Sequence, residues 1–179
     1  MPTSDVLYLV GRPAAGKSTL AAHLCRDLTG ATYRKPFAHR LLLPSPVVAL
    51  GADRAGFPGT DTLGMGVAPT VLEWIARPSA PRLVLGEGDR LASLKLFDQW
   101  RAAGVTVTVA SVEVDDDTLE ARRSARSDWT PAASWLAGRD TKAARLADTA
   151  DVTVPGDDLD RAQALLDWHP VVVALEAAR

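Results

Sequence analysis

The sequence is poor in cysteine and in long apolar runs, and each shortage excludes a class of protein. Cys25 is the one cysteine among 179 residues, which excludes an internal disulfide and a cysteine-rich zinc site. The three histidines are scattered and form no ligand cluster, so any metal should be bound through oxygen. The longest purely apolar stretch, 171–175, is far shorter than the roughly 20 residues that span a bilayer, and no secretion signal opens the chain. We therefore expect a cytoplasmic protein.

Charge of neither sign dominates the composition, yet the charges are unevenly placed. The 20 Lys and Arg residues nearly balance the 22 Asp and Glu residues, and the formal net charge of -2 argues against a protein that coats nucleic acid. Residues 148–167 are acidic, whereas 122–145 form a basic segment. The length fits one domain with its own core, so we expect residues 1–179 to form a single domain with a lid-like segment at about 122–145.

Short apolar runs alternate with helical patterns along the chain, which predicts an α/β fold. The runs are typical of strands in a parallel sheet, and they lie at 6–10, 47–50, 82–85, 105–112 and 151–154. Helices are expected at 18–28, 69–77, 89–103, 115–126, 159–168 and 171–178. Residues 127–150 are expected to form a connection. The pattern predicts three layers, a parallel sheet flanked by helices.

One short motif carries most of the chemical information. Residues 11–18, Gly11-Arg12-Pro13-Ala14-Ala15-Gly16-Lys17-Ser18, fit the phosphate-loop pattern G-x-x-x-x-G-K-[ST] between a buried strand and an amphipathic helix that continues with Thr19. Glycines let backbone N–H groups surround phosphate oxygens, and the helix N-terminus favours negative charge there. Lys17 should contact the β- and γ-phosphates, and Ser18 should bind Mg²⁺ through its hydroxyl. The motif therefore predicts a nucleoside triphosphate with Mg²⁺.

Acidic residues follow two of the predicted strands, at the sheet edge where ligands bind in parallel sheets. Glu87, directly after 82–85, is placed to hold Mg²⁺ or to accept a hydroxyl proton. Asp89 fits the N-cap of the next helix, and Arg90 is expected to pair with it or to bind substrate. Asp53 and Arg54 follow 47–50 and are candidates for acceptor binding, with a turn as the alternative.

A glycine-rich stretch at 51–66 is expected to hold the acceptor over the sheet edge. Within it, Asp61 is a candidate general base for the attacking hydroxyl, and a solvated turn is the alternative interpretation. Thr60 and Thr62 are placed to orient a polar acceptor. Trp74, in the helix that follows, is expected in the core.

Arginines in the basic segment are suited to the transferred phosphate. Arg122 and Arg126 lie four residues apart, on one face of a predicted helix. Guanidinium groups bind phosphate oxygens in bidentate fashion, so both are candidates for stabilising charge during phosphoryl transfer, the alternative being a solvated helix end. Trp129 and Trp135 lie among these basic residues, where they either pack the lid against the body or stack on a nucleic-acid strand.

The order of these parts resembles the small P-loop kinases with a nucleoside monophosphate kinase-like fold, over the whole chain. The resemblance implies that the segment with Arg122 and Arg126 closes as a lid on ATP. It also implies that the loop after the last strand, Val154 to Gly156 with Pro155 between them, lies against adenine. Three phrases are similar to bacteriophage nucleotide kinases: Gly59-Thr60-Asp61-Thr62-Leu63, Gly86-Glu87-Gly88-Asp89-Arg90 and Gly138-Arg139-Asp140-Thr141-Lys142. Some phage P-loop kinases phosphorylate 5-hydroxymethyl groups on pyrimidines in DNA. The base-specificity motifs of adenylate and thymidylate kinases are not recognisable.

The sequence supports three hypotheses of different kinds. The first is a kinase that uses ATP and Mg²⁺ to phosphorylate a nucleotide-like acceptor, at best guess the 5-hydroxymethyl group of a modified pyrimidine in phage DNA, in the host cytoplasm. The second is a kinase of free nucleosides or nucleotides. The third, from another class, is a nucleotide-dependent switch or regulatory NTPase.

Overall fold

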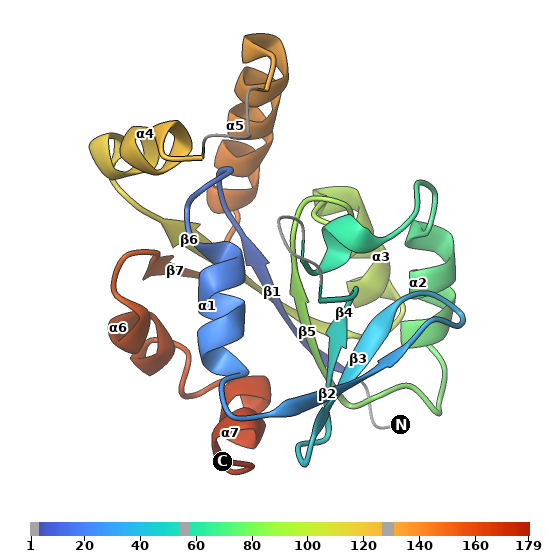
Figure 1. The fold of residues 1–179 in the computed structure, drawn as a ribbon. Coiled ribbons are helices and arrows are strands. Elements are labelled where there is room, and N and C mark those ends of the chain that lie inside the picture. The colour runs from blue at the N-terminus through green and yellow to red at the C-terminus, as the bar shows by residue number, and fades with distance from the viewer. Residues whose placement is uncertain (1–3, 54–57, 127–130) are drawn as a thin grey trace.

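The computed structural model describes residues 4–53, 58–126 and 131–179, and seven strands in these ranges form one sheet (Figure 1). The strands are β1 (Asp5–Val10), β2 (Thr29–Tyr33), β3 (His39–Leu43), β4 (Val47–Leu50), β5 (Leu83–Glu87), β6 (Thr106–Glu113) and β7 (Val152–Pro155). Their order across the sheet is β2-β3-β4-β5-β1-β6-β7. The five strands from β4 to β7 in this order are parallel, while β3 pairs antiparallel with both β2 and β4.

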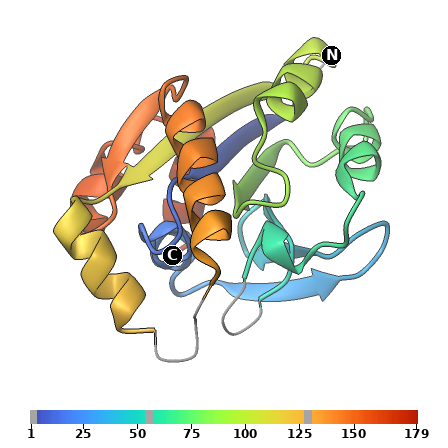
Figure 2. The same cartoon turned by 90° about the horizontal axis from the view of Figure 1, so that it is seen from above.

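Helices cover both faces of the sheet, which gives the three layers seen from two directions in Figures 1 and 2. One face carries α1 (Lys17–Leu24), α6 (Leu159–Ala164) and α7 (Pro170–Glu176). The other carries α2 (Ala68–Ile75), α3 (Leu94–Ala102) and α5 (Ala133–Ala147). The helix α4 (Asp116–Ser124) packs through Leu119 on the phosphate loop, and η1 (Thr60–Thr62) is a short 3-10 turn. No helix in the described ranges is long and apolar enough to cross a membrane.

The strand β1 lies within the parallel part of the sheet and is buried on both faces. Leu7 and Leu9 pack in the core under α1, α6 and α7. Val6, Tyr8 and Val10 pack in the opposite core, with α2, α3 and α5. Two-sided burial explains why the sequence at 6–10 is an unbroken apolar run, and it brings the chain to Gly11 at the carboxyl edge of the sheet.

The parallel sheet predicted from the sequence is confirmed for five strands, and the structure adds two antiparallel strands to it. No element is predicted from the sequence at 29–43, where β2 and β3 form an antiparallel hairpin at the edge of the sheet. Four of the five residues of β2 are exposed, so the hairpin lacks the apolar alternation that marks a strand with one buried face. An edge hairpin of this kind leaves little hydrophobic signal in the sequence.

Two further expectations are corrected. Residues 127–150 were expected to form a connection, but α5 occupies 15 of them, and only Ala143 and Leu146 of this helix are buried. The helix after β5 was expected to begin at Asp89, but α3 begins at Leu94 with Ser93 as its N-cap, where the Ser93 hydroxyl accepts a bond from the Leu96 N–H. Asp89 is therefore not a helix cap.

Candidate active site

The phosphate loop between β1 and α1 owes its shape to glycines at both ends. Gly11 has φ +146°, and a Cβ there would lie 2.4 Å from the carbonyl oxygen of Val112. Gly16, the N-cap of α1, has φ +109°, and a Cβ there would lie 2.6 Å from the carbonyl oxygen of Gly156. Both the backbone conformation and the close neighbours require glycine at these positions. The motif thus forms a tight loop that leads into the N-terminus of α1.

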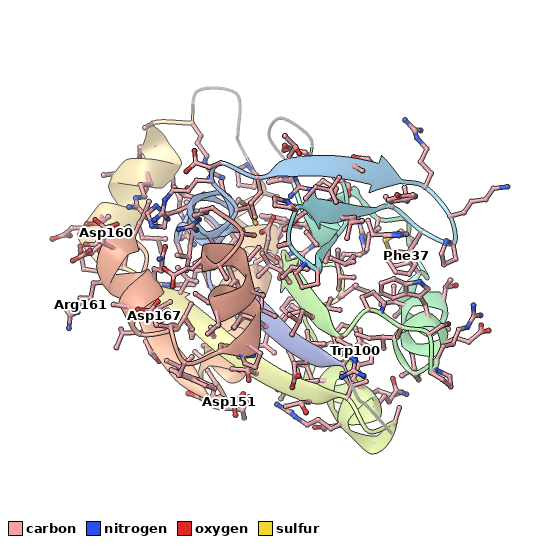
Figure 3. All side chains as sticks on the ribbon, turned by 90° about the horizontal axis from the view of Figure 1, so that it is seen from below. Phe37, Trp100, Asp151, Asp160, Arg161 and Asp167 are labelled. Atoms are coloured by element: carbon pink, nitrogen blue, oxygen red, sulfur yellow. The ribbon has the colours of Figure 1, made fainter. Side chains whose placement is uncertain are left out.

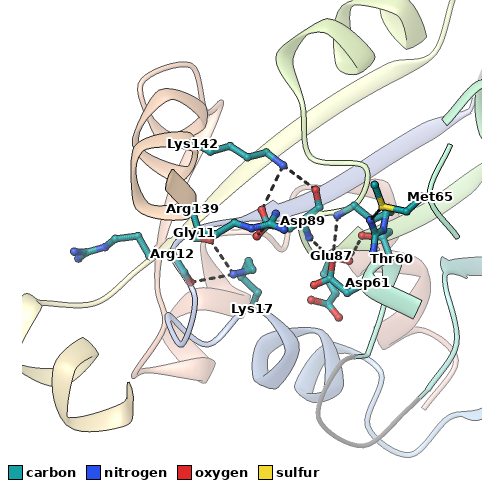
Figure 4. A network of polar contacts seen from close by, with 12 residues as sticks. Gly11, Arg12, Lys17, Thr60, Asp61, Met65, Glu87, Asp89, Arg139 and Lys142 are labelled. Carbon is teal, nitrogen blue, oxygen red and sulfur yellow. Dashed lines mark hydrogen bonds and ion pairs between the residues drawn. The ribbon is translucent and has the colours of Figure 1, made fainter. Parts of the chain in front are cut away.

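Lys17 lies inside this loop, with its ammonium group facing three carboxylates (Figure 4). Its Nζ donates to the carbonyl oxygens of Gly11 at 2.8 Å and Arg12 at 3.0 Å. Burial lowers the pKa of Lys17, while the nearby carboxylates of Asp89, Glu87 and Asp61 oppose that shift. The site therefore holds a positive charge between the phosphate loop and the strand ends.

Glu87 ends β5, beside β1, and its side chain reaches Ser18 at the start of α1. The Ser18 hydroxyl donates to Glu87 Oε2 at 3.0 Å. Glu87 is only 6% exposed, and burial raises its pKa to about 7 against the lowering effects of the Ser18 bond and the Lys17 charge. This carboxyl group can gain or lose a proton near neutral pH.

The residues at this point fit a magnesium ion that is held only in part by protein. Ser18 and Glu87 present oxygen donors side by side. Across the residues that the structure places, no group of three or more His, Cys, Asp and Glu side chains could hold a metal ion alone. Mg²⁺ is commonly bound by one or two side chains together with the phosphates of its nucleotide. The donor set therefore fits Mg²⁺ that arrives with a nucleotide.

The loop around Thr60, which was expected to hold the acceptor, is attached to the end of β5 by hydrogen bonds. The Thr60 hydroxyl donates to the Glu87 carbonyl oxygen at 2.8 Å, and the buried Tyr8 hydroxyl lies 3.0 Å from Thr60 Oγ1. Asp61 Oδ1 accepts from the backbone N–H groups of Asp89 at 2.9 Å and Arg90 at 3.0 Å. Asp61 is thus held in place rather than solvated freely. Thr62 donates within the loop, to the Gly59 carbonyl oxygen.

Asp89 connects the end of β5 to α5. Its carboxylate pairs with Arg139 at 2.9 Å and with Lys142 at 3.5 Å, and Lys142 also donates to the Asp89 carbonyl oxygen at 2.8 Å (Figure 4). The expected pairing of Arg90 with Asp89 is absent from the described contacts, in which the Arg90 guanidinium meets the sulfur of Met65. The acid that was expected to cap a helix therefore joins the basic segment to the sheet.

The arginines of α4 and of the segment just after it take different directions, although Arg122 and Arg126 were expected to share one phosphate-facing surface. Arg122 donates to the carbonyl oxygens of Ala15 at 3.2 Å and Gly156 at 3.1 Å, so it joins the phosphate loop to the loop after β7. Arg123 forms two hydrogen bonds to Asp140 of α5. Arg126 alone of the three lines the cleft above Lys17.

The loop after β7 packs directly on the phosphate loop. Gly156 donates its N–H to the Glu113 carbonyl oxygen at 2.7 Å, and a Cβ on Gly156 would lie 1.9 Å from the Ala15 carbonyl oxygen. Val154 is buried and Pro155 is half-buried. The segment expected to lie against adenine is therefore adjacent to the segment expected to hold phosphates.

Two cavities of about 260 Å³ each lie on either side of the Ser18–Glu87 pair. The first, above Lys17, is lined by the phosphate loop together with Asp61, Asp89, Arg90, Arg126, Trp135 and Arg139. The second lies between α1, β4 and the β2–β3 hairpin, and Asp53 is at its wall, paired with Arg40 at 3.4 Å. Ser18, Pro58 and Glu87 line both cavities.

Sequence reasoning missed Arg40, because a single arginine in a weakly patterned hairpin carries no motif. Two of the residues it did propose, Arg54 and Trp129, lie outside the described residues. Thr19 lies next to Ser18 and lines the first cavity. Most of the proposed site residues thus gather around the two cavities, whereas Thr60, Arg122 and residues 154–156 line neither of them.

Comparisons with known proteins agree with this geometry. A family model described as P-loop Nucleotide Kinase3 matches residues 2–158. A gluconokinase from Sinorhizobium meliloti 1021 is 15% identical, with a TM-score of 0.52 over 98% of this chain and 93% of that chain. A sugar kinase from Janibacter sp. HTCC2649 is 17% identical, with a TM-score of 0.52 over 96% and 98%. The YorR protein from Bacillus subtilis, solved with phosphorylated GDP, is 11% identical, with a TM-score of 0.51 over 97% and 98%. At these identities the likeness shows the fold alone. A search of curated proteins finds no match.

Proposed function

The chain belongs to the P-loop nucleotide kinase family that this model describes, and we propose that it transfers the γ-phosphoryl group of ATP to a hydroxyl of a nucleotide-like acceptor. The observation that carries the proposal is the meeting of Lys17, Ser18 and Glu87 at the carboxyl ends of β1 and β5, between two cavities. Phosphoryl transfer needs a donor and an acceptor on opposite sides of a charged centre. Here one cavity lies on each side of the Ser18–Glu87 pair, so donor and acceptor each have a place.

Each residue at the centre has a role that its position supports. Lys17 stabilises negative charge on the phosphate oxygens, since its ammonium group already lies within the phosphate loop. Ser18 and Glu87 would hold Mg²⁺, which supplies charge neutralisation to the β- and γ-phosphates when bound. Arg126, at the cleft wall, adds charge stabilisation from the lid.

Proton transfer from the acceptor has two candidate bases. Glu87 borders both cavities, but the oxygens with which it could accept a proton are those that would hold Mg²⁺. Asp61 lies beside it in the first cavity, and both backbone bonds to its Oδ1 hold it in one orientation. A ligand of Mg²⁺ is a poor base, so we assign the metal to Glu87 and proton acceptance to Asp61, whose Oδ1 is fixed by the two backbone bonds and whose Oδ2 accepts no hydrogen bond among the described residues.

For the acceptor itself, we propose the 5-hydroxymethyl group of a modified pyrimidine in DNA. The support is the entrance of the first cavity, where Trp135 of α5 is 43% exposed and the Arg139 guanidinium lies 5.0 Å from its ring centre. An aromatic ring next to cations is a surface on which a base stacks while its phosphates are neutralised. Residues 122–145 would then form a lid that closes over a strand as well as over ATP.

A transfer assay with ATP labelled at the γ-phosphate tests both levels of the proposal. Labelled phosphate should appear on an oligonucleotide that contains 5-hydroxymethyluracil and not on the matched oligonucleotide with thymine, which lacks the hydroxyl. Transfer to free 5-hydroxymethyl-2′-deoxyuridine monophosphate alone would reject the DNA acceptor and retain the kinase. ATP hydrolysis at one rate with every acceptor, and no labelled product, would reject the kinase in favour of a regulatory NTPase.

A further inference from the structure

The second cavity has one charged wall and several apolar ones. Its apolar lining comes from α1, β3, β4 and β5, through residues such as Ala21, Leu42, Ala49 and Leu85. Arg40 of β3 supplies positive charge beside its partner Asp53, and Glu87 closes the end that adjoins the first cavity. A space of this kind fits a ligand with a flat apolar body and an anionic group.

Arg40 carries unmet hydrogen-bonding capacity at this wall. Its side chain is 23% exposed, and its contact with Asp53 is a single long one, at 3.4 Å to a carboxylate that is 77% exposed. Its Nε–H is buried and has no hydrogen-bond partner among the described residues. Buried donors are nearly always satisfied, so an unmet one in a ligand-sized cavity calls for an explanation.

We propose that this cavity is the acceptor site and that Arg40 binds a phosphate of the acceptor nucleotide there. The inference rests on the proposed function. A guanidinium group presents donors in a planar fork that matches phosphate oxygens, and phosphate would satisfy it better than one distant contact with an exposed aspartate. The acceptor base would lie on the apolar wall, and its hydroxyl would reach past Glu87 into the first cavity, where Asp61 lies.

Two sources of phosphate share this chemistry: the 5′-phosphate of a free nucleotide and the backbone phosphate of a DNA strand. Equilibrium binding of three probes separates them: 5-hydroxymethyl-2′-deoxyuridine, its 5′-monophosphate, and a short single-stranded oligonucleotide with the same base. All measurements include Mg²⁺ and saturating AMP-PNP, a nonhydrolysable ATP analogue, so that the probes do not enter the phosphate loop.

The wild-type protein should bind the monophosphate about 10- to 100-fold more tightly than the nucleoside, as expected for a charge-assisted bond in a partly buried site. In Arg40→Ala this ratio should fall close to one, and Arg40→Lys should restore part of it. Arg161→Ala is the matched control, because Arg161 lies on α6 at the opposite side of the molecule from the end of the hairpin near Phe37 (Figure 3). A parallel loss of oligonucleotide binding in Arg40→Ala would identify the strand backbone as the source, and its absence would identify the free nucleotide.

The inference is overturned if Arg40→Ala leaves the ratio of monophosphate to nucleoside affinity unchanged, or if this ratio is close to one in the wild type. The proposed function is tested separately, since labelled phosphate transfer does not depend on this ratio. Cys25 supplies a second measurement that needs no substitution, because this single cysteine lies in the wall of the same cavity. Bound monophosphate should slow its alkylation by N-ethylmaleimide several-fold, and an unchanged alkylation rate at saturating probe would place the acceptor elsewhere.

Discussion

The two sides of the candidate active site are built in different ways. The phosphate loop is one run of eight residues, and its shape depends on backbone geometry, with glycines where any side chain would collide. The opposite side comes from four separate parts of the chain: the β2–β3 hairpin, the loop around Thr60, the end of β5, and α5. The first side is local in sequence, and the second exists only after folding.

The difference has a functional consequence. A loop held by backbone contacts and positive φ angles tolerates little change and suits a ligand part that does not vary, such as a triphosphate. A wall made of side chains from separate segments can be altered one residue at a time. We therefore expect substitutions in the phosphate loop to abolish transfer, and substitutions on the other side to change which acceptor is used.

The largest effect is expected from Lys17→Ala. This substitution removes the buried positive charge that would lie next to the phosphates, so the rate of transfer should fall by about 100- to 1000-fold or more. The fold should persist, because the bonds of Lys17 are to carbonyl oxygens of its own loop. Single-turnover transfer and circular dichroism measure the two properties. Lys95→Ala, an exposed lysine on α3, should behave as wild type; a Lys17→Ala protein with normal turnover would contradict the assigned role.

The next largest effect is expected from Glu87→Gln, which should slow transfer by about 100-fold because it replaces a charged ligand for Mg²⁺ with a neutral one. Asp89→Asn should cost far less, since Asp89 contacts α5 rather than Ser18. Comparison of the two turnover numbers at saturating ATP measures this difference. If Asp89→Asn proved the more damaging change, the metal would have to be assigned to Asp89.

The pH dependence of stability provides an independent control for Glu87. The pKa of Glu87 is about 7 in the folded protein, because of its burial, against 4.5 for a Glu side chain in the unfolded chain. The folded state therefore binds the proton more tightly. The stabilisation from this group is complete below pH 4.5 and is lost as the pH rises through 7. Urea unfolding of the nucleotide-free protein should therefore show a steeper decline in stability between pH 5 and pH 8 for wild type than for Glu87→Gln. Equal declines would mean that Glu87 is not the titrating group.

Lys17 and Glu87 show which parts of the site can be predicted from a sequence. The phosphate-loop pattern places Lys17, and the strand-end rule places Glu87 within reach of Ser18, because both rest on local patterns that survive folding. The layers and all five parallel strands follow from apolar runs. The P-loop kinase fold that the resemblance implied is confirmed by the family match.

The parts that the sequence did not predict depend on tertiary contacts. Arg40 reaches the site through an edge hairpin whose strand β2 is largely exposed, and its contact with Asp53 joins β3 to the loop after β4. The α5 helix buries only Ala143 and Leu146, too few residues to mark helical periodicity. Asp89 looked like a helix cap because its partners, Arg139 and Lys142, are fifty residues away in the sequence.

A smaller effect, different in kind, is expected from the two arginines of the basic segment. Arg126→Ala should lower kcat by about 10- to 100-fold with little change in KM for ATP, because Arg126 lines the cleft. Arg122→Ala should mainly raise KM for ATP, because Arg122 holds the loop after β7 against the phosphate loop. Steady-state kinetics of both variants separate the two constants. A fall in kcat alone in Arg122→Ala would mean that Arg122 contacts the transferred phosphate.

The smallest effect is expected from Arg139→Ala, in which the acceptor side loses one contact of several. The ion pair with Asp89 is partly exposed, and such pairs contribute about 0 to 1 kcal/mol, so turnover should fall by no more than about five-fold. Lys142 would still hold Asp89 to α5. A double-mutant cycle of Arg139→Ala with Asp89→Asn measures the coupling, and Arg145→Ala, an exposed arginine of the same helix, controls for charge. If Arg139→Ala alone reduced turnover more than tenfold without coupling to Asp89, the contact of Arg139 with the DNA strand would be essential for transfer, and the acceptor side would contain a fixed requirement like the one that distinguishes the phosphate loop.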